Sequence, residues 1–151
     1  MKKNHIRDYA TEAFRFYART GSAAKYKQEL WDEVIKATNR SNYGGGIGNP
    51  TEAAVSRMEK RLEDARAEIA DLEAVERTIS TLEKMRNGSE MLLALHLVYM
   101  ANPHKEIEKG EISERMHQAE VKIPASERQI YRWLSKARYI FATERGLRIN
   151  F

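Results

Sequence analysis

The sequence contains no cysteine and only three prolines among its 151 residues. The absence of cysteine excludes disulfide bonds, zinc sites with thiolate ligands and catalysis by a thiol. Proline interrupts helices, and residues that favour helices, such as Ala, Glu, Arg, Lys, Leu and Met, dominate the rest of the chain. We therefore predict an all-α fold.

Long apolar runs are also missing. The longest, residues 91–101, is interrupted by His96, and it is far shorter than the roughly 20 apolar residues with which a helix crosses a bilayer. The basic residues at the N-terminus are not followed by the continuous apolar stretch of a secretory signal. We expect no association with a membrane and a location in the cytoplasm.

No group of residues has the spacing of a catalytic site. The carboxylates of residues 51–86 alternate with Lys and Arg at helical intervals, as they do on a solvated helix face. No nucleophile motif occurs, and the four histidines show no paired metal-ligand spacing. We expect a protein that is not an enzyme and that uses no cofactor and no metal.

The first predicted region, residues 1–50, consists of helices followed by a glycine-rich linker. Amphipathic patterns predict helices at residues 4–20 and 23–38, and the glycines cluster in residues 39–50. A glycine-rich loop before a helix can hold phosphate. This one lacks the Lys and the Ser or Thr that follow in a P-loop, and its spacing does not fit G-x-G-x-x-G, so we favour a linker.

The second region, residues 51–86, is predicted to be one long coiled-coil-like helix. Its apolar residues recur at alternating steps of three and four, which is the seam of a coiled coil. The seam consists of Val55, Met58, Leu62, Ala65, Ile69 and Leu72. Such a stripe must be covered either by the N-terminal helices of the same chain or by a second copy in a homodimer, and the pattern does not choose between them.

The third region, residues 87–151, has the pattern of a helix-turn-helix domain. Residues 89–101 are apolar nearly all round and predict a central core helix. A second helical pattern covers residues 111–120, a short stretch that contains Pro124 follows, and a basic helix is predicted at residues 126–142. In a helix-turn-helix the second of two such helices enters the major groove of DNA.

The predicted helix at residues 126–142 has two faces of different chemistry. Ser126 with Gln129 three residues later fits a capping box at its start, and Gly146 is expected to stop the helix. One apolar stripe is formed by Ile130, Leu134, Ala137 and Phe141. Because the basic residues fall outside that stripe, one face can pack on a core while the other meets an anion.

The positive charge is concentrated at the two ends of the chain. The net charge is +4; residues 1–50 carry nine Lys and Arg against five Asp and Glu, and residues 126–151 carry six against two. Neutralising phosphates supplies much of a protein's affinity for DNA. A basic segment that coincides with the second helix of a helix-turn-helix therefore favours double-stranded DNA as the partner.

Eight residues are the candidates for contact with DNA. Arg can donate two hydrogen bonds to guanine, Gln can pair with adenine, and Lys suits a phosphate. The candidates are Ser126, Arg128, Gln129, Tyr131, Arg132, Lys136, Arg138 and Arg145. The alternative is that these charges only keep the helix soluble. Trp133 and Tyr139 are expected to pack on the core rather than to stack on bases.

Two stretches together resemble a known family. IGNPTEAAVSRMEKRLEDARAEIADLEAVERTISTL, followed by an apolar helix and then by SERQIYRWLSKARYIFATERGL, resembles phage-encoded late-gene transcriptional activators of the RinA and ArpU type. The C-terminal part of these activators is similar to region 4 of sigma factors. The residues that carry the resemblance are Pro50, Thr51, Glu52, Ser126, Arg128, Tyr131 and Arg132.

The resemblance covers about residues 43–148. It implies that residues 87–151 are a sigma region 4-like domain that binds promoter DNA. It also implies stimulation of the host RNA polymerase at phage or prophage late genes, in the cytoplasm of a bacterial host cell. A surface away from the DNA would contact the polymerase, and acidic residues that phosphate repels are its candidates. These are Glu106, Glu108, Glu111 and Glu114.

Two other functions fit the same pattern. A phage small terminase subunit also joins a helix-turn-helix to helices that oligomerise, but it serves DNA packaging. The second is a helical adaptor that holds a protein partner through residues 51–86 and does not bind DNA.

Overall fold

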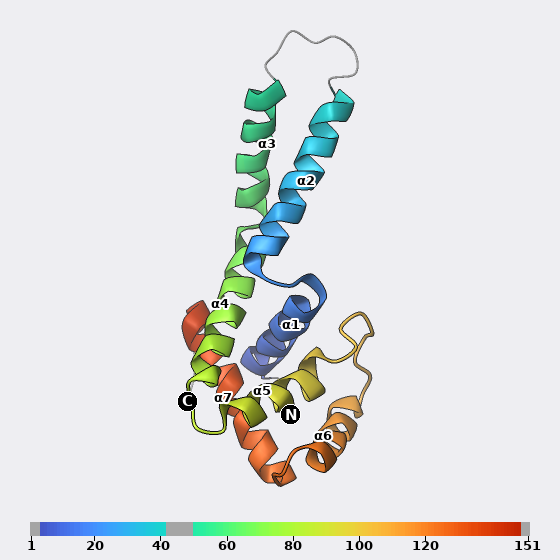
Figure 1. The fold of residues 1–151 in the computed structure, drawn as a ribbon, viewed down its shortest axis with the longest axis vertical. Coiled ribbons are helices and arrows are strands. Elements are labelled where there is room, and N and C mark those ends of the chain that lie inside the picture. The colour runs from blue at the N-terminus through green and yellow to red at the C-terminus, as the bar shows by residue number, and fades with distance from the viewer. Residues whose placement is uncertain (1–3, 42–49, 149–151) are drawn as a thin grey trace.

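The computed structural model describes residues 4–41 and 50–148, and within them every regular element is a helix, as predicted. A π-helical turn, η1 (His96–Met100), continues one of the helices. The α-helices are α1 (His5–Thr20), α2 (Ala23–Ser41), α3 (Pro50–Asp64), α4 (Arg66–Glu83), α5 (Gly88–Leu95), α6 (Glu111–Lys122) and α7 (Glu127–Arg145) (Figure 1). None of these helices is long and apolar enough to span a bilayer.

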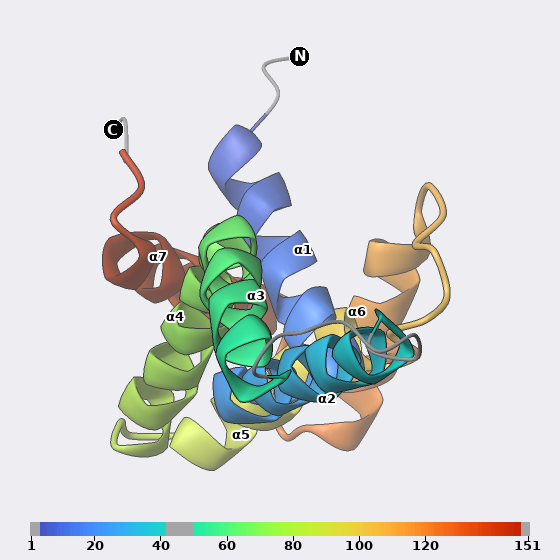
Figure 2. The same cartoon turned by 90° about the horizontal axis from the view of Figure 1, so that it is seen from above.

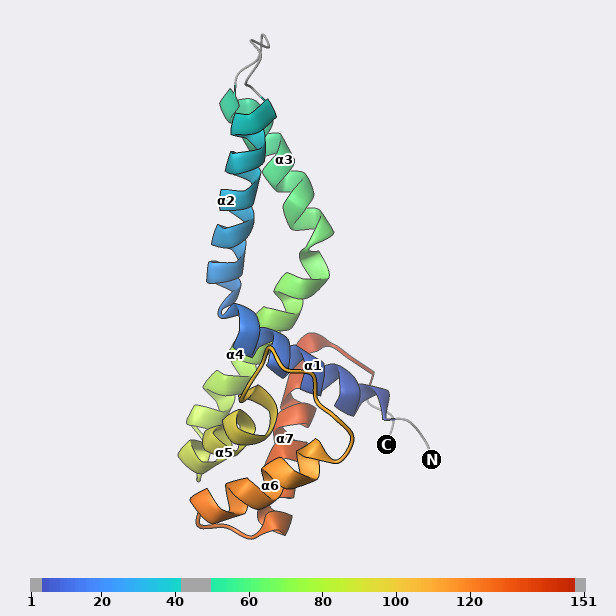
Figure 3. The ribbon, with the colours of Figure 1, turned by 90° about the vertical axis from the view of Figure 1, so that its right-hand side faces the viewer.

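The helices form an arm and a core. α2 and α3 lie side by side and extend away from the other helices as a hairpin arm (Figures 1 and 3). In the core, α4 and the C-terminal half of α7 lie on one side, α6 lies on the other, and α1 lies between them (Figure 2). The predicted glycine-rich linker falls largely on residues 42–49, which lie outside the described residues.

The main hydrophobic core combines residues from all three predicted regions. Phe14 of α1 is fully buried against Phe141 of α7, with ring centroids 5.6 Å apart. Leu82 of α4, Leu95 of α5 and Ile130 of α7 belong to the same buried cluster. The first helix of the chain therefore packs on the helices of the third region, across two of the predicted boundaries.

The predicted single helix over residues 51–86 is wrong, because the chain bends at Ala65 and the second segment ends at Glu83. Ala65 has φ −95° and ψ 11° and is 1% exposed. The bend lets α3 follow α2 along the arm while α4 turns onto the core (Figure 3). The sequence here has neither proline nor glycine, the usual signals of a kink, so the bend follows from packing on both sides.

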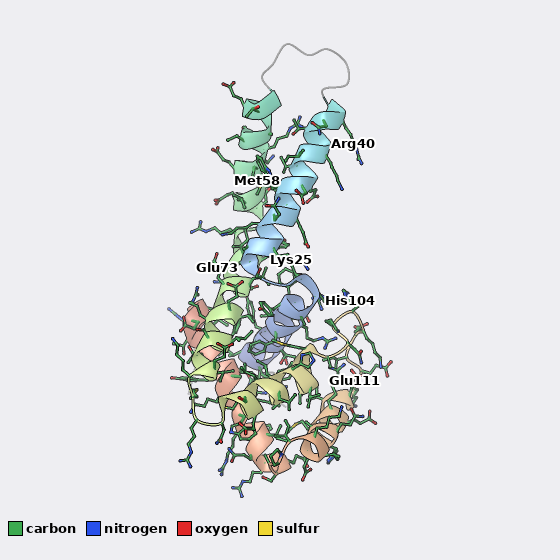
Figure 4. All side chains as sticks on the ribbon, in the orientation of Figure 1. Lys25, Arg40, Met58, Glu73, His104 and Glu111 are labelled. Carbon is green, nitrogen blue, oxygen red and sulfur yellow. The ribbon has the colours of Figure 1, made fainter. Side chains whose placement is uncertain are left out.

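The seam is covered unequally along its length. Ile69 and Leu72 are 8% and 0% exposed and pack in a second cluster with Ala23 and Leu30 of α2. Met58 and Leu62 are half-buried and pack against this cluster. Met58 lies on the side of α3 that faces α2 (Figure 4). Val55, nearer the tip of the arm, is 44% exposed. The buried part of the seam is therefore covered by α2 of the same chain.

Two buried arginines hold the end of η1 and the loop that follows. Arg15 of α1 donates to the carbonyl oxygens of Tyr99 (2.8 Å) and Asn102 (3.0 Å), and also to that of Lys105. Arg115 of α6 donates to the carbonyls of Val98 (3.1 Å) and Ala101 (2.8 Å). Backbone acceptors at a helix end need such partners when they are buried. The two arginines thereby join α1 and α6 to the central helix.

Candidate DNA-binding surface

α6 and α7 are joined by a short connection, which gives the predicted order of helix, turn and basic helix (Figure 1). Ile123 ends α6 in an extended conformation and is 2% exposed, so its side chain anchors the turn in the core. Ser126 is the N-cap of α7, and its hydroxyl accepts a hydrogen bond from the Gln129 amide at 3.2 Å. A capping box consists of two hydrogen bonds, and this is the one in which the N-cap serine accepts from the backbone amide three residues later.

The inner face of α7 is the predicted apolar stripe. Ile130, Leu134, Ala137 and Phe141 are all 2% exposed or less. Trp133, on the flank of the stripe, is 9% exposed, as expected for a packing residue. The helix ends at Gly146, whose φ of 77° is left-handed, and the amide of Leu147 donates to the Ala142 carbonyl.

The outer face of α7 carries a row of cations. Arg128, Arg132 and Lys136 are exposed, recur every four residues and lie opposite the buried stripe. At 1.5 Å per residue the row spans about 12 Å along the helix axis. In the part of the chain that the structure describes, none of the three has an acidic side chain within 4.0 Å. Their charge is therefore available to an external anion.

Tyr139 lies on this outer face, and the expectation that it packs on the core is wrong. It is 50% exposed and follows Lys136 by three residues, which is one helical turn. The signal was present in the sequence, because a rotation of about 100° per residue places position 139 opposite the stripe. Its aromatic character suggested burial, but the helical period was the better guide.

Tyr131 and Arg138 occupy a different side of α7. The Arg138 guanidinium donates to the hydroxyl of Tyr99 at 2.8 Å and lies 5.8 Å from the centroid of the Tyr131 ring. Both residues line a cleft of about 850 Å³ between α1, α7 and the loop before α6. The structure therefore separates these two candidates from the row on the outer face.

Arg145, at the far end of α7, has an intramolecular partner. Its Nε donates to Asp71 of α4 at 2.7 Å, and this hydrogen bond raises the pKa of the guanidinium. The Tyr9 hydroxyl donates to the same Asp71 oxygen at 2.6 Å. Burial, followed by the interaction with Asp71, raises the pKa of Tyr9. The charge of Arg145 is thus compensated inside the protein.

The four acidic candidates for a polymerase surface differ in their exposure to solvent. Glu106, Glu108 and Glu114 are exposed, whereas the Glu111 side chain is only 14% exposed. Glu111 accepts from Lys105 Nζ at 2.9 Å, and this hydrogen bond lowers the pKa of the carboxyl. Its other oxygen lies 3.4 Å from Arg115. Glu111 stands at the start of α6, beside the loop that carries His104 (Figure 4), where it has a structural role.

No protein-family model matches the chain, and no curated protein or solved structure is significantly similar to it.

Proposed function

We propose that this protein binds double-stranded DNA sequence-specifically through the outer face of α7 and activates transcription of phage or prophage late genes. The observation that carries the proposal is the row of Arg128, Arg132 and Lys136, exposed without an acidic partner among the described residues and backed by a fully buried stripe. A helix held this firmly by its inner face can present its outer face to a groove in one orientation.

Within this proposal the candidates take different roles. Arg128 and Arg132, in the first two turns of α7, would read base edges, with Gln129 beside them. Lys136, farther along the helix, would contact a phosphate. Tyr139 extends the same face. Arg138 and Arg145 have intramolecular partners, so we assign them to the support of α7. Ser126 holds the start of the helix.

The DNA proposal is tested with fluorescence anisotropy on a fragment of a late promoter. Arg128→Ala and Arg132→Ala should each weaken binding by about 1 to 3 kcal/mol if the residue contacts a base. Lys136→Ala should weaken binding to all sequences alike and lower the salt slope by about 1. Arg40→Ala, at an exposed arginine near the tip of the arm and away from α7 (Figure 4), is the matched control. Wild-type affinity in both α7 arginine variants would contradict the proposal.

Activation and oligomerisation need separate tests. Transcription from the late promoter with purified host polymerase should rise when the protein is added, and DNA binding without this rise would favour the packaging role of a small terminase subunit. A homodimer, if it forms, would use the exposed part of the seam around Val55, because Ile69 and Leu72 are buried within the chain. Light scattering would then give twice the chain mass of 17.5 kDa.

A further inference from the structure

Three metal-ligating side chains converge across the turn between α6 and α7. His117 and Glu120 stand three residues apart on one face of α6, and Glu127 is the first residue of α7. One ligand atom from each lies within 4.8 Å of the other two. Spacing in the sequence does not reveal the group, because Glu127 comes from a second helix that the turn brings beside His117 and Glu120.

The distances leave room for a small divalent cation between the ligand atoms. His117 Nδ1 and Glu127 Oε2 are 3.6 Å apart, which is too long for a hydrogen bond. Two ligand atoms bound tetrahedrally to zinc at about 2.1 Å are separated by about 3.4 Å. Side-chain rotation can close the remaining distance to Glu120, because His117 and Glu120 are exposed and Glu127 is half-buried. The same exposure gives the ion access from solvent.

We propose that His117, Glu120 and Glu127 form a binding site for Zn²⁺. One imidazole nitrogen and two carboxylate oxygens are three protein ligands, and water completes the four positions that zinc prefers in an open site. The imidazole disfavours Mg²⁺ and Ca²⁺, which take oxygen ligands only. The two carboxylates balance the charge of the ion.

The site also has a consequence for DNA binding, and this consequence rests on the proposed function. Glu127 directly precedes Arg128, and its carboxylate repels a phosphate that approaches the start of α7. Zinc neutralises the negative charge of Glu120 and Glu127 and ties the two helices of the helix-turn-helix together. Bound zinc should therefore strengthen DNA binding.

Zinc binding is tested first on the full chain without DNA, by isothermal titration with ZnCl₂. The wild type should bind one Zn²⁺ per chain, and His117→Ala or Glu127→Gln should weaken binding by at least about tenfold. Glu114→Gln removes the same charge as Glu127→Gln, but from an exposed residue of α6 that is not in the cluster, and His104→Ala removes an exposed histidine elsewhere. Both variants should bind zinc as the wild type does. Circular dichroism confirms that each variant is folded. No zinc binding, or equal binding by all variants, would overturn the site.

The link to DNA is tested by anisotropy with zinc and with EDTA. The wild type should bind promoter DNA more tightly with zinc, and His117→Ala should show no such difference. Zinc binding with unchanged DNA affinity would overturn the link. Loss of zinc binding with intact DNA binding would remove the site and leave the proposed function standing. Zinc binding without DNA binding in any condition would keep the site and remove the proposed function.

Discussion

Arg145 donates a hydrogen bond to Asp71 at 2.7 Å, and this bond joins the end of α7 to the N-terminal half of α4. The Tyr9 hydroxyl donates to the same carboxylate, so α1 takes part as well. The two charged side chains are 25% and 18% exposed. A cation held in this way stabilises three helices and has little charge left for phosphate.

Arg145→Ala should therefore lower stability and leave DNA affinity unchanged. We expect a loss of about 1 to 3 kcal/mol in the free energy of unfolding, since a hydrogen bond to a charged group in a partly buried site is removed. Arg77→Ala is the matched control, because Arg77 pairs with Glu144 across the same helices at greater exposure. It should cost less than about 1 kcal/mol. Urea denaturation and anisotropy measure the two effects, and a clear loss of DNA affinity in Arg145→Ala would restore its role as a DNA contact.

The seam should respond to mutation according to burial. Leu72→Ala removes a side chain that is 0% exposed and should cost about 2 to 5 kcal/mol. Val55→Ala, at a position 44% exposed, should change stability by no more than about 0.5 kcal/mol. Both are measured by urea denaturation at several protein concentrations. If Val55→Ala costs as much as Leu72→Ala, the arm is covered by a second chain.

Substitution by alanine should have different effects on stability at Gly88 and at Gly146. A Cβ at Gly88 would lie 2.3 Å from the Leu82 carbonyl oxygen, so Gly88→Ala forces the backbone between α4 and α5 to move. A Cβ at Gly146 would meet nothing within 4 Å, and only its φ of 77° is unfavourable. Gly146→Ala should cost about 1 to 2 kcal/mol, and Gly88→Ala more. Thermal denaturation gives the order, and the reverse order would contradict the close contact at Gly88.

Activation should be separable from DNA binding at the exposed acidic residues. Reversing Glu106 and Glu108 together to Lys should leave DNA affinity unchanged or slightly raised and reduce transcription from the late promoter. Glu111 is unsuitable for this test, because a lysine there would face Lys105 and Arg115. Glu59→Lys on the arm is the charge-matched control. Transcription that follows DNA occupancy in every variant would exclude a separate polymerase surface on this loop.

Local patterns predicted the individual helices well. The apolar stripe of α7, the Ser126 cap and the Gly146 stop are confirmed because each depends on residues within a few positions of one another. The all-α fold follows for the same reason. The bend at Ala65 was not predictable, since no residue in that stretch prevents a continuous helix and the bend arises from contacts with distant segments.

The sequence by itself determined where helices form and which face of α7 is apolar, because helical periodicity is a local property. Only the tertiary structure decided which charges remain available. Arg128 and Arg145 look alike in the sequence, yet Arg145 meets an acid 74 residues away while Arg128 remains exposed. The same holds for His117 and Glu127, which the turn between α6 and α7 brings together. Pairing of charges depends on distance in space, and the fold sets that distance.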